Sequence, residues 1–275
     1  MNKKVATIIL NRNLPKVTNT LYNNLKNHNK KISDFYILEA GSVRKKLSKN
    51  YTWHANWKSA KKNGLRFARG MNYALSNLYK EKKFDNYKAF FLITNDTTFE
   101  NYNIIEKLYN VLSSKKKIAI LSPCSKNWGE YRLLKRNKTK FFWYIHNNAL
   151  MIKKEFIKEV LNLSSPGYLN FLFDGNNFRG YGLESELIAK AYSNNWSAAI
   201  TSKVLSEENE SYLINNFEEI KTESYDNNLK LYLKEGKKWM KNKYGFSNKW
   251  AFQLYVKNFY DKFFENNPEY KKYRL

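Results

Sequence analysis

Cysteine is nearly absent from this sequence, and long apolar runs are absent altogether. Cys124 is the only cysteine, so no disulfide can form within the chain, and a lone thiol is typical of a reducing compartment. No apolar run approaches the roughly 20 residues that a membrane span needs. The first such run, residues 5–10, is also too short for a signal peptide. We therefore expect a cytoplasmic protein.

Acidic residues are also scarce. Lys and Arg number 49 against 24 Asp and Glu, a net charge of +25. Such a charge attracts polyanions, including nucleic acids, anionic membranes and phosphorylated ligands. Compositional drift explains it equally well, because Lys and Asn recur along the whole chain. In either case, an acidic residue within an apolar segment is a stronger candidate for a functional role, because acidic residues are rare in this chain.

The first half of the chain alternates between two kinds of pattern. Short, β-branched apolar runs predict strands at residues 4–10, 34–38, 51–57, 87–94 and 118–122. Apolar residues at helical spacing predict helices at residues 17–25, 71–79 and 104–113. This alternation is typical of an α/β fold with a mostly parallel central sheet flanked by helices.

The second half has longer and more helical patterns. Residues 139–152 alternate like one long strand, and helices are expected at 154–161 and 183–192. From residue 225 on, the chain is helical in pattern and rich in aromatic residues and Lys. With 275 residues and no Pro-, Gly- or Ser-rich linker, we expect one domain over residues 1–224. A helical extension over residues 225–275 would pack on it.

Two acidic residues follow predicted strands. Asp96 comes after the strand at 87–94, and Glu39 ends the strand at 34–38. Ligands of parallel sheets bind outside the carboxyl ends of the strands. There Asp96 can hold a divalent cation that bridges phosphates, and Glu39 can contact a base or ribose. An Asx-turn or helix cap for Asp96, and a solvated turn for Glu39, remain alternatives.

Two further segments carry candidate binding or catalytic groups. A glycine- and arginine-bearing loop at residues 64–70 precedes a helix, and helix N-termini and Arg side chains bind phosphate. Solvated arginines in a simple loop are the alternative. Glu184 and Glu186 begin the helix at 183–192. The helix dipole favours acids there, but Glu184 also suits a general base on an acceptor hydroxyl.

Five segments together resemble the family 2 glycosyltransferases of the GT-A fold. In chain order they are VATIILNRN, ILEAGS, GLRFARGMNYAL, FFLITNDTTF and YGLESELIAKAYSNNW. They resemble the opening strand with its nucleotide-contacting turn, the strand whose acid meets the base, the G-x-A-x-G-x-N loop, the DXD-type metal site and the acidic helix of the catalytic base. Thr94 stands in the first acidic place of the metal motif, which leaves Asp96.

The resemblance implies a site and a reaction. Glu184 would be the catalytic base and Asp96 the ligand of Mn²⁺ or Mg²⁺. The nucleotide-diphosphate-sugar would contact a set of residues in the first four segments: Asn11, Asn13, Glu39, Arg66, Arg69, Asn72, Asn95 and Asp96. The sugar would pass with inversion to the hydroxyl of a glycan or lipid-linked glycan.

Partners and alternatives follow from the charge and the tail. The basic, aromatic tail predicts a peripheral contact with an anionic membrane. No nucleic-acid module is recognisable, so no specific nucleic acid is expected. A nucleotidyltransferase and a non-catalytic nucleic-acid-binding protein remain the alternative functions.

Overall fold

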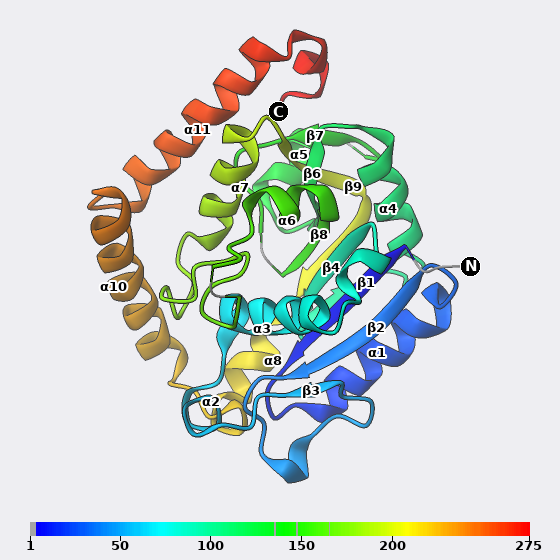
Figure 1. Ribbon diagram of the computed structural model, residues 1–275, viewed down its shortest axis with the longest axis vertical. Coiled ribbons are helices and arrows are strands. Elements are labelled where there is room, and N and C mark those ends of the chain that lie inside the picture. The colour runs from blue at the N-terminus through cyan, green and yellow to red at the C-terminus, as the bar shows by residue number, and fades with distance from the viewer. Residues whose placement is uncertain (1–3, 135, 147, 165) are drawn as a thin grey trace.

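A nine-stranded sheet forms the centre of the described structure (Figure 1). The computed structural model describes residues 4–134, 136–146, 148–164 and 166–275. Along the sheet the strands are β3 (Trp53–His54), β2 (Ser33–Glu39), β1 (Val5–Asn11), β4 (Ala89–Thr94), β8 (Ala149–Lys153), β6 (Ile118–Cys124), β9 (Ser197–Glu208) and β5 (Thr97–Phe99), with β7 (Thr139–Phe141) paired to β9.

The predicted α/β class is confirmed, and the sheet is mixed. β3, β2, β1 and β4 are parallel neighbours, as are β6 and β9. β8 runs antiparallel between β4 and β6. Every residue of β6, and all but the last of β4, is buried. Burial on both faces explains why these strands read as continuous apolar runs in the sequence.

One expectation for the second half is wrong, and one strand was not predicted. Residues 139–152 form two strands, β7 and β8, and not one. The apolar pattern continues between them because Phe142 and Trp143 of the connecting loop pack against the core. The 12-residue strand β9 was not predicted at all, because Ser, Thr, Lys and Glu interrupt its apolar pattern.

Helices cover both faces of the sheet. In chain order they are α1 (Pro15–Asn29), α2 (Lys58–Asn63), α3 (Arg66–Lys80), α4 (Ile105–Ser114), α5 (Gly129–Leu134), α6 (Lys154–Val160), α7 (Leu183–Ser193), α8 (Glu210–Asn215), α9 (Phe217–Ile220), α10 (Tyr225–Tyr244) and α11 (Lys249–Asn266), with 3₁₀ turns at Arg44–Lys46, Phe84–Asn86 and Pro268–Tyr273. The expected loop at 64–70 is largely helical. Gly64, at φ 72°, ends α2, and α3 begins two residues later.

The tail is helical, as expected, and packs back onto the rest of the chain. α10 and α11 follow one another along one side of the molecule, in brown to red (Figure 1). Gly236 of α10 lies so close to Tyr181 that a Cβ atom there would be 2.2 Å from the tyrosine ring. The chain ends on β7, where the Leu275 N–H donates to the Phe141 carbonyl. No helix within the described ranges is long and apolar enough to cross a membrane.

Candidate active site

The carboxyl ends of three parallel strands meet at one edge of the sheet. Asn11 of β1 lies in register with Glu39 of β2, and Leu10 with Thr94 of β4. A cavity of about 200 Å³ opens there. Its lining comes from these strand ends, the start of α3 and the cover helices α8 and α9: Leu10, Asn11, Arg12, Leu14, Ala40, Gly64, Arg66, Phe67, Thr94, Asn95, Asp96, Leu213 and Ile220.

Glu39 is the centre of a hydrogen-bond network at this edge of the sheet. It is fully buried, and the Asn11 side-chain amide donates to both of its carboxylate oxygens, at 2.9 and 3.1 Å. Ser42 and the Ser48 N–H also donate to it. Asn11 in turn accepts a hydrogen bond from Asn95 at 2.9 Å. Both carboxylate oxygens of Glu39 therefore have protein partners. Through Ser42 and Ser48 the residue fixes the loop after β2.

Asn13 has a similar ordering position. At φ 59° it is in the left-handed region, and its side chain links two loops. Its carbonyl oxygen accepts from the Val43 N–H, and its amide donates to the Glu219 carbonyl of α9. Asn13 therefore connects the turn after β1 to the helices that cover the cavity.

Two guanidinium groups face the cavity. Arg12 and Arg66 both line it, and the Nε atom of each is buried without a hydrogen-bond partner in the described structure. Burial, and next the charge of Arg66, lower the pKa of Arg12 to about 10. Burial also lowers the pKa of Arg66, against the opposite effect of Glu223. Two cations held together with unused donors form a site that favours an anion.

Asp96 is the acidic group of the cavity. It is 2% exposed, and its Oδ2 atom is also buried without a partner among the described residues. Burial raises the pKa of Asp96, and the charge of Glu210 adds to this effect. An unsatisfied buried carboxylate oxygen costs free energy unless a cation or donor binds it.

A second carboxylate lies beside Asp96. Thr97 pairs with Glu208 of β9, and the Asn209 N–H donates to the Asp96 carbonyl at 3.0 Å. The neighbouring atoms that keep water from its carboxylate, and next the charge of Asp96, raise the pKa of Glu208 to about 7, although the residue as a whole is exposed. A group that titrates near neutrality beside an unsatisfied carboxylate suits cation binding.

These two carboxylates fit a divalent ion bound together with phosphate. Magnesium sites commonly use one or two carboxylates and take the remaining ligands from substrate phosphates and water. The described residues contain no cluster of three or more His, Cys, Asp or Glu side chains that would hold a metal by themselves. The orphaned Asp96 oxygen, with Glu208 beside it, is the feature that fits.

Arg69 and Asn72 form hydrogen bonds with the loop that precedes α7. Arg69 donates to the Gly175 carbonyl at 2.6 Å and stacks over Phe178. The amide of Asn72 donates to the Phe173 carbonyl at 2.8 Å, and its oxygen accepts from two backbone N–H groups of the same loop. Both side chains therefore fix the loop before α7, and neither lines the cavity.

Glu184 begins α7 inside an aromatic enclosure. It is 7% exposed, and burial raises its pKa. Lys249 of α11 acts in the opposite direction, with its Nζ 3.9 Å from a Glu184 oxygen. The same ammonium lies over the rings of Tyr144 and Tyr181. Glu184 is thus a buried carboxylate held near the ammonium group of Lys249.

Glu186 has a different environment from Glu184. Its carboxylate accepts from Lys243 at 2.6 Å and from the Tyr244 hydroxyl. Lys243 also bridges to Asp174, which accepts from Trp239 as well. Glu186 and Asp174 therefore tie α7 and its preceding loop to α10, whereas Glu184 makes the longer, 3.9 Å ion pair with Lys249.

Tyr232 of α10 connects the two acidic regions. After burial, the charge of Glu184 is the largest cause of its raised pKa, and Glu208 also contributes. The phenol therefore lies within electrostatic reach of both carboxylates.

No protein-family model and no curated protein sequence matches this chain. Solved structures do. A mannosyltransferase from Pyrobaculum calidifontis, in complex with GDP-mannose and Mn²⁺, aligns at TM-score 0.50 and 12% identity over 73% of this chain and 55% of its own. GalNAc-T7 with UDP, GalNAc and Mn²⁺ aligns at TM-score 0.51 and 10% identity over 75% and 44%. The chain has the GT-A glycosyltransferase fold. It spans about half the length of these matched structures.

The sequence analysis did not select two residues that the structure adds to the candidate site. Arg12 stands between the two asparagines that were chosen, and only the cavity distinguishes it from other surface arginines. Glu208 ends the unpredicted strand β9. Three acidic residues close together in so basic a chain, Glu207, Glu208 and Glu210, were the available signal for it.

Proposed function

We propose that this protein is an inverting glycosyltransferase that moves a sugar from a nucleoside diphosphate onto an acceptor hydroxyl. The observation that carries the proposal is one set of unsatisfied buried atoms around one cavity. Arg12 Nε and Arg66 Nε offer donors for a diphosphate, and Asp96 Oδ2 offers an oxygen for a cation. The GT-A fold and the nucleotide and Mn²⁺ named for the matched structures support it.

Each residue has a defined part in this proposal. Asp96 and Glu208 would hold Mn²⁺ or Mg²⁺, which when bound neutralises diphosphate charge. Arg12 and Arg66 would bind the diphosphate oxygens. Arg69 and Asn72 would act indirectly, by fixing the loop that leads to Glu184. Asn11, Asn13, Asn95 and Glu39 would hold the nucleotide-binding edge in shape.

Glu184 is the proposed general base. Its carboxylate would take the proton of the acceptor hydroxyl while the acceptor oxygen forms a bond to the anomeric carbon. The bond from that carbon to the diphosphate breaks, and the departing oxygen keeps the electron pair. Attack from the face opposite the diphosphate inverts the anomeric configuration. A raised pKa in a buried site suits a carboxylate that must accept a proton near neutral pH.

The acceptor side of the proposal concerns the tail. Trp250 and Leu254 lie four residues apart on α11, and they are 68% and 45% exposed. Such neighbours share one face of a helix, and Lys residues surround them in the sequence. We propose that this face rests on an anionic membrane, where a lipid-linked glycan acceptor would be presented.

The test is calorimetric titration of the protein with UDP and GDP, each with and without Mn²⁺. We expect Mn²⁺-dependent binding of one or both nucleotides. Equal binding with and without the metal would contradict the role of Asp96, and no binding of either nucleotide would contradict the function. Transfer is then measured with the matching sugar nucleotide by release of the nucleoside diphosphate.

A further inference from the structure

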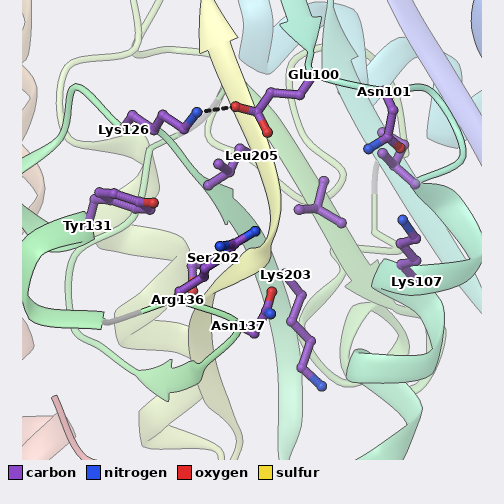
Figure 2. A pocket seen from close by; sticks show the side chains of 12 residues that line it. Glu100, Asn101, Lys107, Lys126, Tyr131, Arg136, Asn137, Ser202, Lys203 and Leu205 are labelled. Carbon is purple, nitrogen blue, oxygen red and sulfur yellow. Dashed lines mark ion pairs between the residues drawn. The ribbon is translucent and has the colours of Figure 1, made fainter.

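A basic groove of about 400 Å³ shares no lining residue with the cavity that holds Asp96. Figure 2 shows the side chains that line this groove. It is lined from α4, α5, β9 and the loops beside them: Glu100, Asn101, Ile104, Lys107, Lys126, Tyr131, Arg136, Asn137, Ser202, Lys203, Val204 and Leu205. A second hollow, of about 450 Å³, shares Lys107, Asn137 and Lys203 with it. The two hollows therefore continue one another.

The charge of this groove is not balanced from within. Glu100 is the only acid in its lining, and it pairs with Lys126, as Figure 2 shows. Lys107, Arg136 and Lys203 have no ion pair with any described residue. Cations concentrated in a concave surface raise the local concentration of anions more than the same charges on a convex surface do.

The backbone is shaped to present these cations. Along the β6–β9 pairing, Pro123 lies opposite Thr201 but Cys124 lies opposite Leu205, so β9 bulges over residues 202–204. The bulge is pinned to the next loop, because the Ser202 N–H donates to the Lys138 carbonyl at 2.9 Å. Bulges are common beside functional sites, where they redirect side chains. Here the bulge carries Lys203, and the pinned loop carries Arg136.

The groove also leads to the proposed active site. Lys203 and Glu208 belong to the same strand, five residues apart, which corresponds to about 17 Å of extended chain. At the near end, Glu100 follows β5, the strand that pairs with the end of β9. A chain-like ligand seated in the groove would therefore run along β9 toward the Asp96–Glu208 pair.

We propose that this groove binds an anionic stretch of the acceptor, a glycan chain that carries phosphate or carboxylate groups. The assignment of the ligand as acceptor rests on the proposed function. A repeating oxyanion chain matches three uncompensated cations along a groove, whereas a single phosphate would use only one or two of them. Nucleotide recognition in the separate cavity would remain independent of this groove.

The test measures binding of dye-labelled polyphosphate by fluorescence anisotropy over a range of salt concentrations. Polygalacturonate and a single-stranded oligodeoxynucleotide of equal charge serve as competitors. The variant is K107Q/R136Q/K203Q, and the matched control is K16Q/K80Q/K271Q, which removes the same charge from exposed positions elsewhere. We expect the groove variant to lose at least tenfold in affinity and about two units of salt slope, since each contact contributes roughly 0.7.

The outcomes separate cleanly. Preference for polyphosphate or polygalacturonate identifies the acidic group of the acceptor. Equal losses in the groove variant and the control would overturn the proposal, because net charge alone would then explain binding. Tightest binding of the oligonucleotide, lost in the groove variant, would also overturn it in favour of nucleic acid.

D96N should abolish Mn²⁺-dependent nucleotide binding and retain polyphosphate binding. Failure of nucleotide binding in the parent protein would contradict the proposed function without affecting the groove measurement.

Discussion

Glu208 and Asp96 are brought together by the pairing of β5 with β9, and the charge of Asp96 helps to raise the pKa of Glu208 to about 7. Without a cation, this raised pKa favours the protonated form of Glu208 more than in an ordinary carboxylate. A bound cation would have to displace that proton. The affinity for the cation is therefore linked to pH through this one carboxylate.

The first prediction concerns this linkage. Mn²⁺ affinity in the presence of nucleotide should rise about tenfold from pH 6 to pH 8, because Glu208 loses its proton over that range. E208Q should weaken binding and abolish the pH dependence. E207Q is the control, since Glu207 bonds Ser125 and Asn127. Calorimetry in buffers of different ionisation enthalpy measures the released proton, and an unchanged pH dependence in E208Q would exclude Glu208.

The second prediction concerns the buried base. E184Q should lower the transfer rate by about 10²- to 10⁴-fold, the usual contribution of a general base, while nucleotide affinity stays unchanged. The substitution also removes a buried charge, so Tm at pH 8 should rise by about 2–4 °C, the shift that 1 kcal/mol causes in a chain of this size. The gain should be smaller at pH 5. A carboxylate with a raised folded-state pKa destabilises the fold only as pH rises above its ordinary value.

The third prediction uses Glu186 as the counterpart of Glu184. E186Q weakens the bonds to Lys243 and Tyr244, and charge-assisted hydrogen bonds contribute about 1.5–3 kcal/mol each. We expect a lower Tm and a transfer rate reduced less than in E184Q. If E186Q instead abolished transfer in a folded protein while E184Q remained active, the two roles would be reversed.

The fourth prediction concerns Lys249, whose charge lowers the pKa of Glu184. K249M removes that charge, so the pKa of Glu184 should rise further. The base is active only when deprotonated, and the acidic limb of the kcat/KM profile should therefore move to higher pH. K249R keeps the charge and should leave the limb in place. A limb that stayed fixed in K249M would argue against Glu184 as the titrating base.

The fifth prediction concerns the two arginines of the cavity. R12Q or R66Q should weaken UDP or GDP binding by about 10- to 100-fold, since a hydrogen bond to a charged group contributes about 1.5–3 kcal/mol. Binding of the uncharged nucleoside should change little. R69Q is the control, because Arg69 bonds the Gly175 carbonyl and does not line the cavity. Equal losses for nucleoside and diphosphate would place the arginines away from the phosphates.

The membrane proposal has its own test, by flotation with phosphatidylcholine vesicles with and without phosphatidylglycerol. Binding should require the anionic lipid and weaken with salt. W250S/L254S should reduce the bound fraction about tenfold or more, given the apolar area lost. L133S changes an equally exposed side chain on α5 and should have no effect. Protein that ignores anionic vesicles would contradict the proposal.

The sequence by itself determined the fold class and which polar residues meet at one edge of the sheet. The apolar runs at residues 4–10 and 87–94 are so continuous that only buried central strands explain them. Once those strands are parallel neighbours, the polar residues that follow them must gather at one edge. Asn11, Glu39, Asn95 and Asp96 could be placed at this edge in this way, but their hydrogen bonds could not be predicted.

The tertiary structure decided which polar atoms are satisfied and which distant residues meet. In the structure, Glu39 accepts a hydrogen bond from Asn11, whereas the Oδ2 atom of Asp96 has no hydrogen-bond partner among the described residues. These hydrogen bonds depend on the conformation of loops, and no local sequence pattern specifies that conformation. Glu208 lies near Asp96 because β9 pairs with β5 in one particular register. The polar residues of β9 interrupt its apolar pattern, so the sequence did not predict this strand. Long-range strand pairing is decided by the packed sheet as a whole, and therefore the candidate cation site became visible only in three dimensions.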